Sequence, residues 1–327
     1  MDYRKLEPVR VHELERSKFR QFLDLNGEWN FDLDRENKGL DSGWEKPEFS
    51  AFSDTIKVPG CLEAQGKGLT YLPPSKPLWG GTCDMPYFGV SWYQKRFSLP
   101  KGMRGKQLVL NFGGVATDCT VWLNGKRLGE HHCASIPFGF EVTGAVIKDS
   151  ENTLTLKVEN NDTYKSFTPP NSHGLGSTTM EMRWSGIYRG VELVASEEVH
   201  VADLHVIPHA LEGKVEFKCA LSGKWNNNTT FEAHVSAWND RESISAAGAG
   251  NVESDRFGIT LDIENPRFWT DEDPYLYRAE VTIFEDGKAC DSITERFGLR
   301  DICYDGTHYL LNGKPVYLRG ELVHYHW

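Results

Sequence analysis

The sequence predicts an all-β protein, because its apolar residues recur in short runs with alternating spacing and turn signals separate those runs. The 327-residue chain is 39% hydrophobic and 12% aromatic, and it contains 31 Gly and 15 Pro residues. Aromatic residues favour strands, whereas Gly and Pro interrupt them. The chain also exceeds the length at which one hydrophobic core usually keeps growing, so we expect two or three domains.

The charge of the chain excludes some classes of partner. Its formal net charge is −11 and its pI is about 5.5, which argues against a nucleic-acid partner because phosphate backbones are held by clustered Lys and Arg. No apolar run approaches the roughly 20 residues that span a bilayer, so no membrane contact is expected. The first ten residues lack the apolar stretch of a secretory signal. We therefore expect a cytoplasmic protein, or a periplasmic or secreted one if a signal peptide has been removed.

The cysteines and glycines give no sign of a metal or a cofactor. No C-x-x-C pair and no zinc-like His spacing occur, and neither a Gly-rich phosphate loop nor an EF-hand loop is found. The sequence therefore predicts no cofactor and no metal site, and leaves homo-oligomerisation open. We interpret the seven cysteines as reduced core thiols: Cys61, Cys83, Cys119, Cys133, Cys219, Cys290 and Cys303.

Strand patterns over residues 1–196 favour an antiparallel sandwich of the jelly-roll type. An Asn-Gly turn signal precedes Trp29 and Phe31, which can face one core together. Trp92 and Trp122 lie inside predicted strands, so we assign them to the core with Trp29. Strands are expected at 56–60, 91–97, 107–112, 120–126, 138–142 and 152–158.

Two long segments of this first domain are irregular, namely 72–88 and 167–184. The first of them is rich in Pro, which cannot donate to a strand ladder. Binding residues concentrate on loops that a rigid scaffold holds. The two segments are therefore the places in the first domain where a ligand contact is expected.

A second group of strands follows over residues 197–297 and fits an immunoglobulin-like sandwich. Its strands are expected at 199–206, 215–221, 231–238 and 277–284. Residues 298–327 differ, because a small hairpin at 309–320 runs into a strand with nothing after it to pair with. We expect this last segment to be the first piece of a further domain.

The order of short motifs resembles family 2 of the glycoside hydrolases, which includes β-galactosidases, β-glucuronidases and β-mannosidases. The motifs are LNGEWNF at Leu25, VPG at Val58, GVSWYQKRFSLP at Gly89, VWLNGKRLGEH at Val121, SGIYRGVEL at Ser185, NPRFWTDEDPYLY at Asn265, ERFGLRD at Glu295 and YLLNGKPVYLRG at Tyr309. The resemblance implies a jelly-roll sugar-binding domain at 1–196, an immunoglobulin-like domain at 197–297, and the first strand of a truncated (β/α)8 catalytic barrel at 298–327. It also implies a retaining exo-β-glycosidase that hydrolyses terminal β-glycosides, with a β-galactosidase as the first expectation.

No catalytic residue is predicted within this chain. A retaining glycosidase needs two carboxyl groups about 5–5.5 Å apart, one as the acid and one as the nucleophile. The resemblance implies that both glutamates lie on later barrel strands. We therefore expect this chain alone to be inactive.

The resemblance nevertheless suggests which residues contact sugar. The family's Val-Asn-Arg-His-Glu type of run after Arg-Gly is replaced here by Glu321-Leu322-Val323-His324, and His324 falls where the substrate-facing His is expected. A buried structural His is the alternative. From the two irregular segments, Trp79 and Trp184 are candidates for stacking on a pyranose ring, although a Trp beside a strand is also often part of a core or an interdomain plug. The candidates for hydroxyl contacts are Asp84, Glu181 and Arg183.

Two other classes of protein have the same architecture. A free-standing carbohydrate-binding or interaction protein would use the sandwiches without an enzyme, and an adhesion-type pair would lack any lead into a barrel. Fold alone does not separate them, since sandwiches host many functions. The hairpin after residue 297 favours the enzyme, because a binding module has no use for it.

Overall fold

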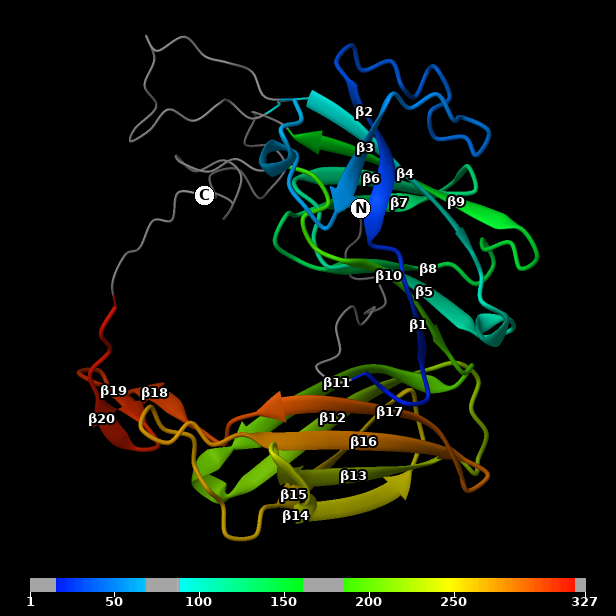
Figure 1. The fold of residues 1–327 in the computed structure, drawn as a ribbon. Helices are drawn as coiled ribbons and strands as arrows, with labels where there is room; N and C mark the ends of the chain where they lie inside the picture. Colours follow the sequence, from blue (N-terminus) through cyan, green and yellow to red (C-terminus); the bar gives the residue numbers. More distant parts are fainter. Residues whose placement is uncertain (1–15, 69–86, 88, 161–184, 321–327) are drawn as a thin grey trace. The chain divides into compact units, whose positions relative to one another are not determined.

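The protein is almost entirely β-structure, as predicted. The computed structural model describes residues 16–68, 87, 89–160 and 185–320, in which every regular element is a strand or a three-residue 3-10 turn (Figure 1). This part of the chain contains no helix long and apolar enough to cross a membrane. It divides into two compact units, one from Phe22 to Ala195 and one that joins the segment ending at Gln21 to the chain from Ser196 onward.

The first unit consists of two sheets. The larger has the order β3-β2-β4-β9-β6-β7 and is antiparallel throughout, and the smaller has the order β1-β10-β5-β8. The strands are β1 (Gln21–Asp24), β2 (Gly27–Asp34), β3 (Asp54–Val58), β4 (Gly89–Ser98), β5 (Gln107–Phe112), β6 (Asp118–Leu123), β7 (Lys126–His132), β8 (Phe138–Glu141), β9 (Glu151–Asn160) and β10 (Val191–Ser196). Strand β4 lies between β2 and β9, so strands far apart in the sequence are neighbours in this sheet.

The main core of this unit is built by alternation along the strands. Trp29 and Phe31 of β2 and Tyr93 of β4 are each at most 1% exposed, and the Phe31 and Tyr93 rings meet edge to face at 5.1 Å. The Trp29 indole N–H donates to the Leu25 carbonyl oxygen at 2.9 Å, so the only polar atom of this side chain is satisfied within the core. The prediction that Trp29 belongs to the core is confirmed.

A second apolar layer lies on the opposite face of the larger sheet. Trp92 and Trp122 are buried as predicted, but they stack on each other at 5.5 Å outside the main core, because Trp92 neighbours Tyr93 and adjacent residues of a strand face opposite ways. Residues 35–53, between β2 and β3, cover them with Trp44 and Phe52. We call this group the outer aromatic cluster: Trp44, Phe52, Val90, Trp92 and Trp122.

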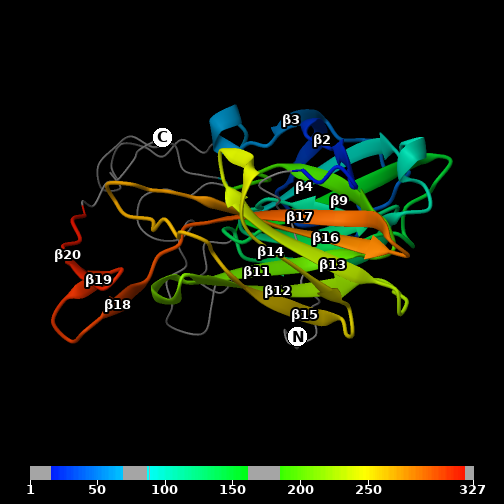
Figure 2. The same ribbon diagram turned by 90° about the horizontal axis from the view of Figure 1, so that it is seen from below.

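The second unit is also a two-sheet sandwich. Its sheets have the orders β11-β12-β15 and β14-β13-β16-β17, and their pairings are antiparallel (Figure 2). The strands are β11 (His200–His209), β12 (Lys214–Ser222), β13 (Thr230–Ala237), β14 (Asp240–Asn251), β15 (Arg256–Asp262), β16 (Tyr277–Glu285) and β17 (Lys288–Phe297). Phe217, Val281 and Tyr277 are among the buried residues between these sheets.

A small three-stranded sheet follows the second sandwich. It comprises β18 (Ile302–Tyr304), β19 (Tyr309–Leu311) and β20 (Lys314–Val316), and the hairpin predicted after residue 309 is confirmed by the β19–β20 pairing. The Asn312 side chain at its turn accepts from the Asp301 N–H at 2.9 Å and donates to the Trp269 carbonyl oxygen at 3.0 Å. The hairpin is therefore tied to the loop that precedes β16, while Tyr304, Tyr309 and Tyr317 stay exposed.

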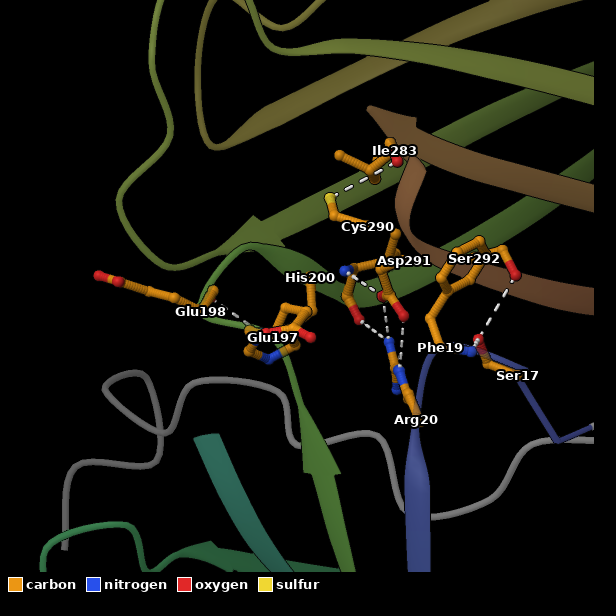
Figure 3. Close-up of polar contacts among 11 residues, drawn as sticks. Ser17, Phe19, Arg20, Glu197, Glu198, His200, Ile283, Cys290, Asp291 and Ser292 are labelled. Carbon is orange, nitrogen blue, oxygen red and sulfur yellow. Dashed lines mark hydrogen bonds and ion pairs between the residues drawn. The ribbon is translucent and has the colours of Figure 1, made fainter. Parts of the chain in front are cut away.

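The segment before β1 is held to the second sandwich by a buried ion pair. The Arg20 guanidinium donates to both carboxylate oxygens of Asp291, at 3.0 and 2.7 Å, and to the Val201 carbonyl oxygen at 2.7 Å (Figure 3). Asp291 also accepts the Val201 N–H at 2.8 Å. The side chains of Arg20 and Asp291 are 6% and 1% exposed, so this pair lies inside the unit.

The cysteines fit the prediction only in part. The six described ones are free thiols, and Cys119 and Cys219 are buried core residues. Cys303 is exposed on β18, so the prediction of a core thiol is wrong there, because its strand belongs to the small sheet and not to a sandwich. Cys83 lies outside the described residues.

Candidate functional site

The side chains predicted to contact sugar all lie outside the described residues. They are Trp79, Asp84, Glu181, Arg183, Trp184 and His324. The structure does describe the residues that flank the two irregular segments of the first unit. These flanks determine where both segments leave the sandwich.

The chain before the first irregular segment is bonded to the chain after the second. Glu63, in the 3-10 turn Glu63–Gln65, accepts the Ser185 N–H on one carboxylate oxygen at 3.1 Å and the Ser185 hydroxyl on the other at 2.9 Å. Next to it, the Leu62 N–H donates to the Ser185 carbonyl oxygen at 3.0 Å. Residues 122 positions apart are thereby held side by side.

The two remaining flanks are bonded in the same way. Asn160 ends β9 and Gly89 begins β4, and these two residues face each other in the ladder. The Asn160 side-chain amide donates to the Tyr87 carbonyl oxygen at 2.9 Å. The flanks of the two irregular segments are therefore bonded in two pairs, and we call these four residues the loop base: Glu63, Tyr87, Asn160 and Ser185.

Close packing around the Tyr87 ring explains two of the glycines at this place. A Cβ on Gly68 would lie 2.7 Å from Tyr87 Cβ, and one on Gly89 would lie 2.6 Å from the Tyr87 hydroxyl oxygen. Gly68 has a φ of +67° and Gly89 a φ of +153°, so any other residue would also be strained in its backbone. The Tyr87 hydroxyl donates to the Val90 carbonyl oxygen at 3.1 Å.

The loop base contains a carboxyl group in an unusual environment. Burial raises the pKa of Glu63 above its ordinary value, while the hydrogen bonds from Ser185 oppose that rise. Burial also raises the pKa of the neighbouring Cys61 thiol to about 11, so the protonated thiol is favoured at neutral pH. Across the described ranges no group of three or more His, Cys, Asp and Glu side chains is arranged to hold a metal ion.

The residues of the loop base were not predicted from the sequence. Ser185 lies in the SGIYRG motif and Tyr87 borders the first irregular segment, but neither pattern indicates a partner far along the chain. Glu63 carries no local signal at all. Its role becomes visible only in the folded chain, where the Leu62 N–H and the Glu63 carboxylate both bond to Ser185. The loop base can hold two segments in a fixed relation, and it offers no pair of groups suited to acid–base chemistry of its own.

The Glu63 bonds lead to a testable prediction about stability. Glu63→Ala leaves the buried Ser185 N–H without its partner, so we expect a loss of about 1–3 kcal/mol in the free energy of unfolding of the first unit. Glu63→Gln can accept from that N–H and donate to the Ser185 hydroxyl, so it should be neutral or stabilising at pH 7.5. Urea unfolding measures the stability of both variants. The matched control is Glu36→Gln, because Glu36 forms an exposed ion pair with Lys38.

The pH dependence gives this prediction a second readout. A carboxyl whose pKa is raised on folding stabilises the protein fully below its unfolded-state pKa and loses that contribution as the pH rises through the folded-state pKa. Wild type should therefore lose stability relative to Glu63→Gln between pH 5 and pH 7.5. Equal stability of all variants at both pH values would contradict this role of Glu63.

Sequence comparison matches the two sandwiches to two consecutive domains of one family. Residues 22–196 match the profile "Glycosyl hydrolases family 2, sugar binding domain", and residues 199–300 match "Glycosyl hydrolases family 2". A β-glucuronidase of Paenibacillus borealis is 24% identical over 92% of this chain and 49% of its own length. A β-galactosidase of Thermoanaerobacter pseudethanolicus is 28% identical over 72% of this chain and 31% of its own length. The chain thus spans about half or less of these curated relatives.

Solved structures agree with the fold. A β-glucuronidase from Ruminococcus gnavus, solved in complex with D-glucuronic acid, superimposes with a TM-score of 0.73 at 23% identity, covering 96% of this chain and 52% of that one. Its apo structure gives a TM-score of 0.74. The resemblance inferred from the motifs is confirmed, because the sugar-binding-domain profile alone covers more than half of the 327 residues. This chain belongs to family 2 of the glycosyl hydrolases.

Proposed function

We propose that this chain is the N-terminal, non-catalytic part of a retaining exo-β-glycosidase that removes terminal β-linked sugars. The observation that carries the proposal is the consecutive match of two family domains, at 22–196 and 199–300, in a chain that spans about half or less of relatives named as glycosidases. The two carboxyl groups of a retaining mechanism are then supplied by polypeptide beyond these domains. By itself the chain hydrolyses no glycoside.

In this proposal the two sandwiches brace a catalytic barrel and shape its substrate pocket. Residues 1–196 form the sugar-binding domain, 197–297 the immunoglobulin-like domain, and 298–327 the start of the barrel. Within this division, the start of the last segment is tied to the second sandwich, because the Asn312 side chain donates to the Trp269 carbonyl oxygen.

The loop base supports a shared role for the two irregular segments. Since both of them begin and end at Glu63, Tyr87, Asn160 and Ser185, their side chains can act on one ligand. We assign stacking on a pyranose ring to Trp79 and Trp184. The sugar hydroxyl contacts are assigned to Asp84, Glu181, Arg183 and, from the barrel start, His324.

The first candidate substrate is a terminal β-galactoside, and the second is a β-glucuronide. The Glu321-x-x-His324-Tyr325 run favours the first, and the names of the relatives include both activities. Galactose and glucuronic acid differ in the group at C6 and in the configuration at C4. A pocket whose polar side chains hydrogen-bond the groups at these two carbons therefore distinguishes the two sugars.

The reading frame beyond Trp327 provides the test. We expect the extended polypeptide to release 4-nitrophenol from a 4-nitrophenyl β-D-galactoside or β-D-glucuronide, with retention of anomeric configuration by NMR. An extended protein that turns over neither of these substrates, or that inverts the configuration, would refute the proposal. Comparing kcat/KM for the two substrates decides between the candidates.

A further inference from the structure

Three buried oxygen atoms on the outer face of the larger sheet have no hydrogen-bond partner. They are Glu45 Oε2, Gln94 Oε1 and Thr155 Oγ1, and this statement covers the described part of the chain. Gln94 is 1% exposed and Thr155 is fully buried. An unsatisfied buried polar group costs about 1–3 kcal/mol, so three of them need an explanation.

Two of these atoms share one place by strand register. Gln94 on β4 lies directly opposite Thr155 on β9, and Thr155 in turn lies opposite Trp122 on β6. Directly opposite residues project from the same face of a sheet with Cβ atoms about 4.5–5.5 Å apart. Both side chains therefore lie on the face that carries the outer aromatic cluster.

Contacts of its neighbours place Glu45 over the same point. On one side of it, the Trp44 ring packs against Trp92 with centroids 6.0 Å apart. On the other side, the Pro47 carbonyl oxygen accepts from Arg96 at 2.9 Å. Gln94 lies between Trp92 and Arg96 on β4, and its side-chain amide donates to the Phe49 carbonyl oxygen at 3.1 Å.

The segment around Glu45 thus runs along β4 above Gln94. The Oε2 atom of Glu45 is shielded from solvent, so it points into the protein. None of the ion pairs found among the described residues includes Glu45, and the nearby Arg96 is paired with Glu151 at 3.1 Å. A carboxylate oxygen of the covering segment and two oxygens of the sheet face below it are therefore buried without a hydrogen-bond partner.

We propose that Glu45, Gln94 and Thr155 bind a single hard cation, Ca²⁺, which fixes the 35–53 segment to the sheet. Carboxylate, amide and hydroxyl oxygens are ligands that Ca²⁺ takes, in flexible geometry and with water completing the shell. The site has no nitrogen or sulfur donor, so it does not suit zinc or copper. The bound ion offsets the Glu45 charge and supplies the partner that each oxygen lacks.

The test uses the full chain after chelator treatment and dialysis. Adding CaCl2 to about 100 times the dissociation constant should raise the unfolding midpoint of the first unit by about 5–10 °C. Intrinsic fluorescence should follow this transition, because Trp44, Trp92 and Trp122 pack together on this face of the sheet. Titration calorimetry should give one Ca²⁺ per chain, and MgCl2 should have a smaller effect because Mg²⁺ demands a stricter octahedron.

Matched variants separate a cation from an ordered water. Glu45→Gln and Thr155→Val should each abolish the response to Ca²⁺, whereas Asp41→Asn, on the exposed part of the same segment, should keep it. The proposal would be overturned if the wild type showed neither heat of Ca²⁺ binding nor a shift in its unfolding midpoint. It would also be overturned if Glu45→Gln responded to Ca²⁺ like the wild type. A water-only site predicts a different pattern, in which Thr155→Val alters stability equally with and without Ca²⁺.

Discussion

Asp291→Ala is expected to destabilise the second unit by about 3–5 kcal/mol, because it leaves the Arg20 charge buried without its partner. Arg20 and Asp291 are 6% and 1% exposed, so water cannot replace the lost carboxylate. The Val201 N–H loses its acceptor in the same variant. Arg20→Ala should produce a loss of similar size by leaving the carboxylate unpaired.

The measurement is urea unfolding of the two single variants, with hydrogen exchange of the Val201 amide as a local readout. Glu212→Ala breaks an exposed pair with Lys214 and is the matched control, expected to change stability by at most about 1 kcal/mol. The double variant Arg20→Met, Asp291→Leu should lose less than either single variant, since no buried charge remains. Single variants as stable as the control would show that the pair does not hold the segment before β1 to the second sandwich.

Trp29→Ala is expected to cost the first unit about 3–5 kcal/mol. The side chain is 1% exposed in the main core, and its removal leaves a cavity between the two sheets. The Leu25 carbonyl oxygen also loses the indole N–H that donates to it at 2.9 Å. Both effects act on the same unit and in the same direction.

Chemical unfolding followed by far-UV circular dichroism tests this prediction. Ile136→Ala serves as the control, because Ile136 is 58% exposed and its truncation should change stability by about 0.5 kcal/mol or less. A loss below about 1 kcal/mol in Trp29→Ala would mean that the β2 face does not form the core described here.

The sequence predicts those strands that combine alternation with β-branched or aromatic residues. Strands β2, β4 and β9 are of this kind, and their buried faces agree with the prediction. In the second sandwich β14, β15 and β17 were missed, and the sequence of β14, DRESISAAGAGN, is rich in Ala and Gly, which strands disfavour. Its place in the sheet comes from pairing with β13, which is a tertiary effect.

The same reason explains what was missed at the loop base. The two irregular segments could be recognised as candidates for ligand binding, because they contain Pro residues and show no hydrophobic periodicity. Their common origin could not, because it depends on the register that brings Gly89 opposite Asn160. The Arg20–Asp291 pair likewise joins residues 271 positions apart, and no local pattern relates them.

The most direct test of this account is an assay of the purified 327-residue chain with 4-nitrophenyl β-D-galactoside and β-D-glucuronide. We expect 4-nitrophenol to be released no faster than by uncatalysed hydrolysis in buffer. The reason is that the acid and the nucleophile of a retaining mechanism are assigned to polypeptide outside these residues. Specific turnover of either substrate, abolished by replacing one carboxylate of this chain, would contradict the claim that the two sandwiches are non-catalytic.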